Sequence, residues 1–207
     1  MLWRLLLLLY AQDPTYLIVP GVRIGPITRT STERSLLAAF GKDALKQPVD
    51  TGQGMMEPGL VLYPDDPARR LEIVWTDETP AHPATIFICP GAIEVACRWR
   101  TATGVGFGTT LKDLERRNGK PFEMVIWGSD VGGNVTSFRG GTLERELQSR
   151  ALFLTLDPAL DKEGGYVPKL SDQEKLAVQG EKFVLSSDPV LQKLNPHVDG
   201  MRLQFAR

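Results

Sequence analysis

The order of strand and helix signals is the feature that most constrains the fold of this chain. Residues 15–90 and residues 91–157 each predict a strand, a short helix and three further strands. Short apolar runs of strand length are separated by turn residues in both units. The expected strands are 16–19, 60–63, 71–75 and 84–89 in the first unit, and 93–99, 124–127, 135–138 and 152–156 in the second. We therefore expect an α+β fold of antiparallel sheet with short helices on one side.

The helix of each unit has recognisable start and stop signals. Thr30 and Glu33 have the spacing of a capping box, and Gly41 is placed to end the helix that follows them. Thr110 and Gly119 have the same roles in the second unit. Four positions of the two helices match when Thr32, Arg34, Leu36 and Gly41 are aligned with Thr110, Lys112, Leu114 and Gly119. The shared order of elements, more than these matches, indicates an internal repeat.

A C-terminal extension, residues 158–207, follows a different pattern. Ser171 and Glu174 have capping-box spacing, 183–185 is apolar and extended, and Asp188 with the following proline can begin a short helix. A final strand buried on one face is indicated by the alternation of Met201, Leu203 and Phe205 with Arg202, Gln204 and Ala206. We expect one domain over residues 12–207, completed by this helix and strand.

Length and charge limit the classes of function. The 207 residues correspond to one domain or two small ones, and the 42% of hydrophobic residues suffices for a core without metals. Lys and Arg number 24 against 25 Asp and Glu, so the net charge is −1. No basic field is available to hold a phosphate backbone, and we do not expect nucleic acid as a partner.

The N-terminus has the pattern of a short secretory signal peptide. Arg4 precedes the apolar run 5–11, and Gln12 begins a polar segment. We expect residues 1–11 to direct export and cleavage to follow Ala11, although a buried N-terminal strand or helix is the alternative. The run is shorter than the roughly 20 apolar residues of a membrane span. A periplasmic or secreted protein without a stable membrane span is therefore predicted.

Cys89 and Cys97 are the only cysteines, and two arrangements are open to them. Pro90-Gly91 marks a turn, and a tight hairpin around it would hold the two Cα atoms beyond the roughly 7 Å that a disulfide can bridge. Two separately packed thiols would result. A wide loop would instead bring the cysteines together, and export makes a disulfide chemically possible.

Several stretches resemble known proteins. Val22-Arg23-Ile24-Gly25-Pro26-Ile27, the helix ending at Phe40-Gly41, and Asn118-Gly119-Lys120-Pro121-Phe122 resemble a family of uncharacterised exported bacterial proteins. The duplicated unit is similar in architecture to the β-lactamase inhibitor protein fold and to small outer-membrane assembly lipoproteins. The second resemblance implies protein binding, although this chain lacks the lipid-bearing cysteine of those lipoproteins.

Motifs for catalysis are weak. Gly104-x-Gly106-x-Gly108 lacks the third glycine of a dinucleotide fingerprint, so a tight turn is the simpler interpretation. The histidines, His82 and His197, lie beside prolines in turn settings, and no Gly-x-Ser-x-Gly motif surrounds a serine. The Asp65-Asp66 pair belongs to a turn between prolines. We therefore predict no catalytic residues, no metal and no cofactor.

A recognition patch is the most specific site prediction. Trp99, Trp127, Asp130 and Arg139 would lie at one edge of the sheet and offer aromatic and charged contacts. The glycine-rich stretch around Asp130 is also explained by an ordinary hairpin loop. Three functions follow: a non-catalytic envelope module that binds a protein or cell-wall material, a hydrolase-like enzyme of unrecognised type, or a structural or stress-related envelope protein. We favour the first.

Overall fold

The computed structural model describes residues 14–79, 81–91, 97–128, 131–147, 151–180 and 182–205. It confirms a mixed α+β fold whose sheets are mostly antiparallel and which ends in a helix and a strand. The predicted signal peptide, residues 1–11, lies outside the described residues. None of the described helices is both long enough and apolar enough to cross a membrane.

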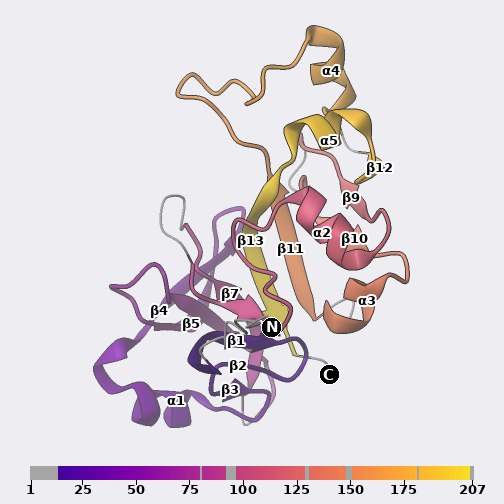
Figure 1. Cartoon of the computed structure of the whole chain (residues 1–207). Coiled ribbons are helices and arrows are strands. Elements are labelled where there is room, and N and C mark those ends of the chain that lie inside the picture. The colour runs from indigo at the N-terminus through magenta and orange to yellow at the C-terminus, as the bar shows by residue number, and fades with distance from the viewer. Residues whose placement is uncertain are drawn as a thin grey trace, which may run out of the picture.

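A six-stranded antiparallel sheet forms the centre of the molecule, in the order β11-β13-β7-β6-β5-β4. Its strands are β4 Ala44–Gly52, β5 Met55–Leu62, β6 Leu71–Trp75, β7 Pro83–Ile88, β11 Leu152–Asp157 and β13 His197–Gln204. The final strand β13 was expected from alternation, and Met201 and Leu203 are indeed buried. It pairs with β11 on one side and β7 on the other, so it joins the two parts of the chain (Figure 1).

Two smaller sheets pack around the large one. The first has the order β3-β2-β1-β8 and contains the one parallel pair among the described strands, β1 with β8. Its strands are β1 Leu17–Val19, β2 Arg23–Ile24, β3 Ile27–Thr28 and β8 Arg100–Thr101. The second has the order β10-β9-β12 and is built from β9 Glu123–Val125, β10 Val135–Ser137 and β12 Phe183–Leu185.

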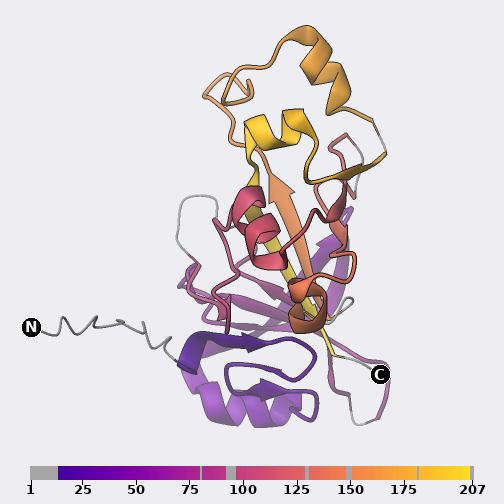
Figure 2. The same ribbon diagram turned by 45° about the vertical axis from the view of Figure 1, so that its right-hand side comes forward.

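The helices begin at polar caps, mostly where the sequence places them. They are α1 Glu33–Phe40, α2 Leu111–Asn118, α3 Thr142–Leu147, α4 Asp172–Ala177 and α5 Pro189–Leu194. Ser171 and Glu174 form the capping box expected for α4. For α1 the expected cap is wrong, because Thr32 with Ser35 forms the box in place of Thr30 with Glu33. Figure 2 shows α1 with the β1–β3 strands at one end of the molecule and α4 at the other.

The core lies on one face of the six-stranded sheet. Leucines of α1, α2, α3 and α5 and isoleucines of β1–β3 belong to the same buried cluster as alternate residues of the large sheet, including Leu60, Ile73, Ile86 and Leu203. The small sheets and these helices therefore cover the same face. The opposite face carries the other half of each strand, as alternation requires.

Three sequence expectations need correction. The segment between Gly41 and Leu60, for which the sequence predicted no strand, contains most of the hairpin β4–β5, in which Pro48 lies opposite Pro58. The expected strand 93–99 falls partly outside the described residues, and its described end, 97–99, is irregular. The two repeat units are not arranged alike: β4–β7 are neighbours in one sheet, whereas β9 and β10 lie in a different sheet from β11. An internal repeat is therefore not shown.

Candidate functional site

Trp99, a member of the predicted recognition patch, is a core residue. Its side chain is 1% exposed and makes an edge-to-face contact with Tyr16 at 5.3 Å between ring centroids. Its indole Nε1–H donates to the carbonyl oxygen of Arg69 at 2.9 Å. A fully enclosed tryptophan cannot contact a partner, so the patch loses this residue. The assignment of Trp99 to the recognition patch is therefore wrong, and the strand expected to carry it is not formed at 97–99.

Trp127 and Arg139 stay at the surface. Trp127 is half-buried, and its Nε1–H donates to the carbonyl oxygen of Leu156 at 2.8 Å, which fixes the indole against β11. Arg139 is exposed and has a left-handed backbone with φ of 54°. Asp130 lies outside the described residues. The flanking strands β9 and β10 pair antiparallel, and Trp127 packs against the core, so it stabilises the fold whether or not it contacts a partner.

Cys89 and Cys97 are joined in a disulfide, with their Cα atoms 6.0 Å apart. Cys89 lies directly after β7 and has a left-handed backbone with φ of 47°. Of the two arrangements open to the cysteines, the structure therefore has the disulfide and not the separately packed thiols. Both side chains are almost completely buried, at 0% and 1% exposure.

The disulfide-linked segment holds the turn 64–70 in place through its backbone. Arg98 N–H donates to the carbonyl oxygen of Ala68 at 2.9 Å, and Cys89 N–H donates to that of Arg70 at 2.8 Å. The indole of Trp99 bonds the carbonyl oxygen between them, that of Arg69. Three consecutive carbonyl groups of the turn are thus satisfied by residues at or beside the disulfide.

This turn presents an aromatic and charged cluster. The Arg69 guanidinium lies 4.4 Å from the ring centroid of Tyr63 and donates to the Asp66 carboxylate at 2.6 Å. That hydrogen bond is the main reason why the pKa of Asp66 is below its ordinary value. Burial raises the pKa of Tyr63, while the charge of Arg69 opposes the rise. The predicted turn pair Asp65-Asp66 therefore has one carboxylate engaged with Arg69 and the other, Asp65, exposed.

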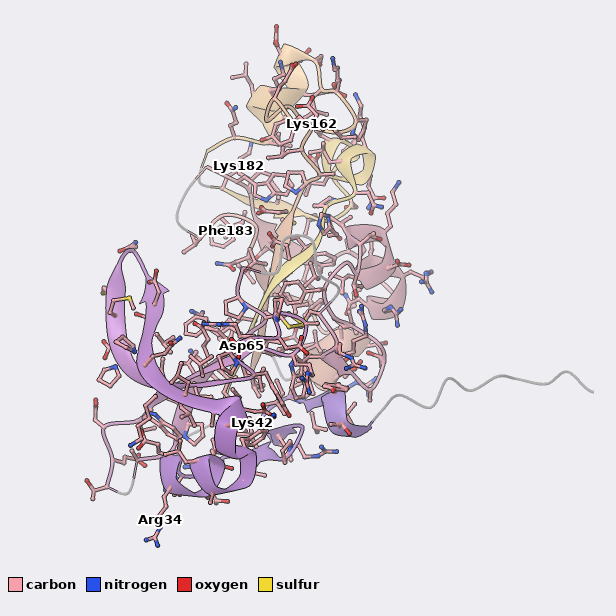
Figure 3. The ribbon with its side chains drawn as sticks, turned by 90° about the vertical axis from the view of Figure 1, so that its left-hand side faces the viewer. Arg34, Lys42, Asp65, Lys162, Lys182 and Phe183 are labelled. Atoms are coloured by element: carbon pink, nitrogen blue, oxygen red, sulfur yellow. A yellow bond between two sulfur atoms is a disulfide. The ribbon has the colours of Figure 1, made fainter. Side chains whose placement is uncertain are left out.

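A cavity of about 330 Å³ opens beside this cluster and is lined by Asp43, Tyr63, Pro64, Asp65, Asp66, Pro67 and Arg69. Figure 3 shows Asp65 and Lys42 on the same side of the molecule. The volume is sufficient for a small polar group, and the lining includes three aspartates and one arginine. Among the described residues, no three His, Cys, Asp or Glu side chains are grouped to hold a metal ion.

The histidines do not combine with this cavity. His82 lies with Nδ1 3.4 Å from the carbonyl oxygen of Ser31. His197 is half-buried in β13 and pairs in register with Asp157 of β11. Nearby, burial and then the adjacent Asp157 carboxyl raise the pKa of Asp199 to about 7. Asp199 therefore takes up its proton near neutral pH.

An exposed aromatic residue marks the edge of the β10-β9-β12 sheet. Phe183 in β12 is 68% exposed, and Leu185 in the same strand is 37% exposed. β12 is the last strand in this sheet. The apolar triplet 183–185 is visible in the sequence, but its position at a sheet edge depends on the pairing with β9.

Comparison of the chain with protein-family models, curated proteins and solved structures gives no match. The candidate sites therefore rest on the geometry and chemistry of this chain's own residues.

Proposed function

We propose that this protein is an exported, non-catalytic module that binds another protein by adding one of the partner's strands to β12. Export is supported by the signal-like pattern of residues 1–11 and, weakly, by the Cys89–Cys97 disulfide, since disulfides persist mainly in oxidising compartments. The observation that carries the binding proposal is the exposed edge of β12, where Phe183 presents its aromatic ring to solvent.

The backbone of β12 pairs with β9 on one side and with no described strand on the other. Ile126 N–H donates to the carbonyl oxygen of Lys182, and Ser186 N–H donates to that of Phe122, so the even-numbered residues of β12 face β9. In an antiparallel pair the intervening residues direct their backbone groups the other way. The backbone N–H and C=O groups of Phe183 and Leu185 therefore point outward. Of these, the carbonyl oxygen of Leu185 accepts from Asp188 N–H. An outward N–H and C=O at one residue form a template for an added strand.

The side chains of β12 favour an apolar partner strand with an acidic flank. Phe183 lies opposite Val125 and Leu185 lies opposite Glu123, so both project from the face away from the core residue Met124. Lys182 is exposed beside Phe183. None of the ion pairs among the described residues includes Lys182. Figure 3 shows the two side chains close together on one side of the molecule.

The test places a photo-crosslinking amino acid at position 183 in the full chain and, as a matched control, at Leu176, an apolar residue of α4 that is 70% exposed. We expect one protein to crosslink at 183 and not at 176. With that protein purified, Phe183→Ser should weaken binding by about 1–3 kcal/mol, and Leu176→Ser should leave it unchanged.

Strand addition has a second signature. Leu185→Pro removes an outward N–H, so it should also weaken binding, while the far-ultraviolet circular dichroism of the free protein stays the same. A partner that binds the Phe183 and Leu185 variants as tightly as the parent would refute the proposal. Capture of cell-wall material at both positions would favour the alternative ligand class.

A further inference from the structure

The face of the six-stranded sheet opposite the core carries one continuous cross-strand row. Successive strand pairings connect Leu45 to Val61, Val61 to Glu72, Glu72 to Phe87, Phe87 to Arg202 and Arg202 to Phe153. Residues directly opposite one another in paired strands project to the same face. The sheet thus places Arg202 between two phenylalanines, Phe87 and Phe153.

This row lies outside the buried core cluster, although Val61 within it is fully buried. The buried core cluster takes its sheet residues from the other face, and Phe87, Arg202 and Phe153 are half-buried instead of enclosed. Thr85 and Gln204 follow in the adjacent row, also half-buried and with Gln204 Nε2 3.5 Å from the Thr85 hydroxyl. The centre of the face is therefore partly shielded from water and carries polar groups beside aromatic ones.

Arg202 has an unmet hydrogen-bonding capacity. Its guanidinium lies 4.8 Å from the ring centroid of Phe153. None of the ion pairs among the described residues includes it, and its Nε is shielded from solvent with no acceptor in the structure. The carboxylate in the same row, Glu72, is bonded to Arg70 and is separated from Arg202 by the strand that carries Phe87. A buried donor without a partner is uncommon and calls for an acceptor.

We propose that this face is a second binding site and that Arg202 receives an acidic side chain of a peptide segment. The guanidinium presents its N–H groups as a planar fork that matches a carboxylate in two parallel hydrogen bonds. The ligand's charge is complementary to the unpaired cation, and its oxygens bond the guanidinium N–H groups other than the shielded Nε–H. Partial shielding by the two rings strengthens the pairing, because a hydrogen bond to a charged group is worth more out of water.

The aromatic neighbours select a peptide side chain. Phe87 and Phe153 offer apolar surface for the methylene groups that carry a glutamate carboxylate, and aromatic residues with arginine are enriched in the centres of protein interfaces. The Thr85 hydroxyl and the Gln204 amide lie one row away and can bond the peptide's own polar groups. This site is independent of β12 and of the strand addition proposed there.

The experiment follows the Arg202 Nε–H resonance of the isotopically labelled full chain while a capped hexaglutamate peptide is added. The resonance is identified by its loss in Arg202→Lys. We expect it to shift and saturate, to respond far less to hexaglutamine, and to require more peptide as salt is raised. Arg202→Lys keeps the charge but loses the fork, so binding monitored through backbone amides should weaken about tenfold.

Arg98→Lys is the matched control, because Arg98 is also an arginine stacked on an aromatic ring, with its guanidinium 4.5 Å from the Tyr16 centroid. This variant should bind like the parent. Phe153→Leu should weaken binding several-fold and keeps the assay informative if Arg202→Lys does not fold. An unmoved Nε–H resonance, equal responses to the two peptides, or equal losses in the Arg98 and Arg202 variants would overturn the site. Binding of an acidic polysaccharide in place of hexaglutamate would overturn the peptide assignment.

Discussion

Reduction of the Cys89–Cys97 disulfide is expected to lower the free energy of unfolding by about 2.5 kcal/mol. The bond joins residues separated by 8 positions, and the chain-entropy relation gives about that value for a loop of this length. The loop is short, so the contribution lies near the lower end of the usual range. The bond acts mainly by restricting the unfolded chain, and its reduction removes no atoms from the folded core.

The measurement is thermal unfolding of the same protein with and without a reductant. For a chain of about 200 residues, each kcal/mol shifts Tm by about 2–4 °C, so reduction should lower Tm by about 5–10 °C. Comparison of oxidised and reduced protein is cleaner than mutation, since replacing two buried cysteines also changes packing. The Cys89→Ala/Cys97→Ala variant serves as control, because its Tm should not respond to the reductant.

Two outcomes would contradict this reasoning. If the oxidised and reduced proteins unfold within about 1 °C of each other, the bond does not restrict the unfolded chain as calculated. If reduction also abolishes the tertiary signal of Trp99 at low temperature, the disulfide is required to form the turn 64–70. In the structure that turn also depends on backbone hydrogen bonds that survive reduction.

Three further predictions concern other parts of the chain. Asp199→Asn should stabilise the protein by about 1 kcal/mol at pH 8, a value reduced from the full shift because the group is partly solvated. The pKa of Asp199 is raised to about 7, so between about pH 4 and pH 7 the folded state holds a proton that the unfolded state has released. The stabilising effect of this proton is lost as the pH rises to about 7. In urea titrations the parent and the Asp199→Asn variant should therefore have the same stability near about pH 4. Gly133→Ala should destabilise the protein by roughly 2 kcal/mol more than Gly164→Ala. Both glycines have φ near 80°, but only at Gly133 would the new methyl group collide with the carbonyl oxygen of Leu156. Calorimetry of the two variants measures the cost of this collision. Mass spectrometry of exported material should show a chain that begins directly after residue 11, and an intact N-terminus would contradict the signal-peptide prediction.

Much of the secondary structure could be predicted because its signals are local. Strands β6, β7 and β11 lie where apolar runs indicate them, and α2 and α5 begin at the predicted caps, Thr110 and Asp188. The hairpin β4–β5 was missed because its residues lack alternation and include Pro48 and Pro58. Its strands are defined by their pairing with each other and with β6. A short stretch of sequence does not contain this pairing information.

The candidate sites could be predicted only in part, for the same reason. Alternation in the final strand correctly separates Met201 and Leu203 from Arg202. It does not reveal that Arg202 lies between Phe87 and Phe153, since that row depends on the register of three strands far apart in the chain. Trp99 shows the converse error: it was assigned to the recognition patch, whereas its side chain is enclosed in the core.

The central position of β13 has a consequence for how the molecule folds. β13 follows every other strand of its sheet in the chain, yet β7 and β11 meet only through it. Such pairings join residues of large sequence separation, and chains dominated by them fold on the millisecond-to-second scale. The segment that contains β4–β7 and the segment that contains β11 therefore cannot complete the sheet separately and dock afterwards. Assembly of the sheet is expected to be a single cooperative event, with the arrival of residues 197–204 as its slow step.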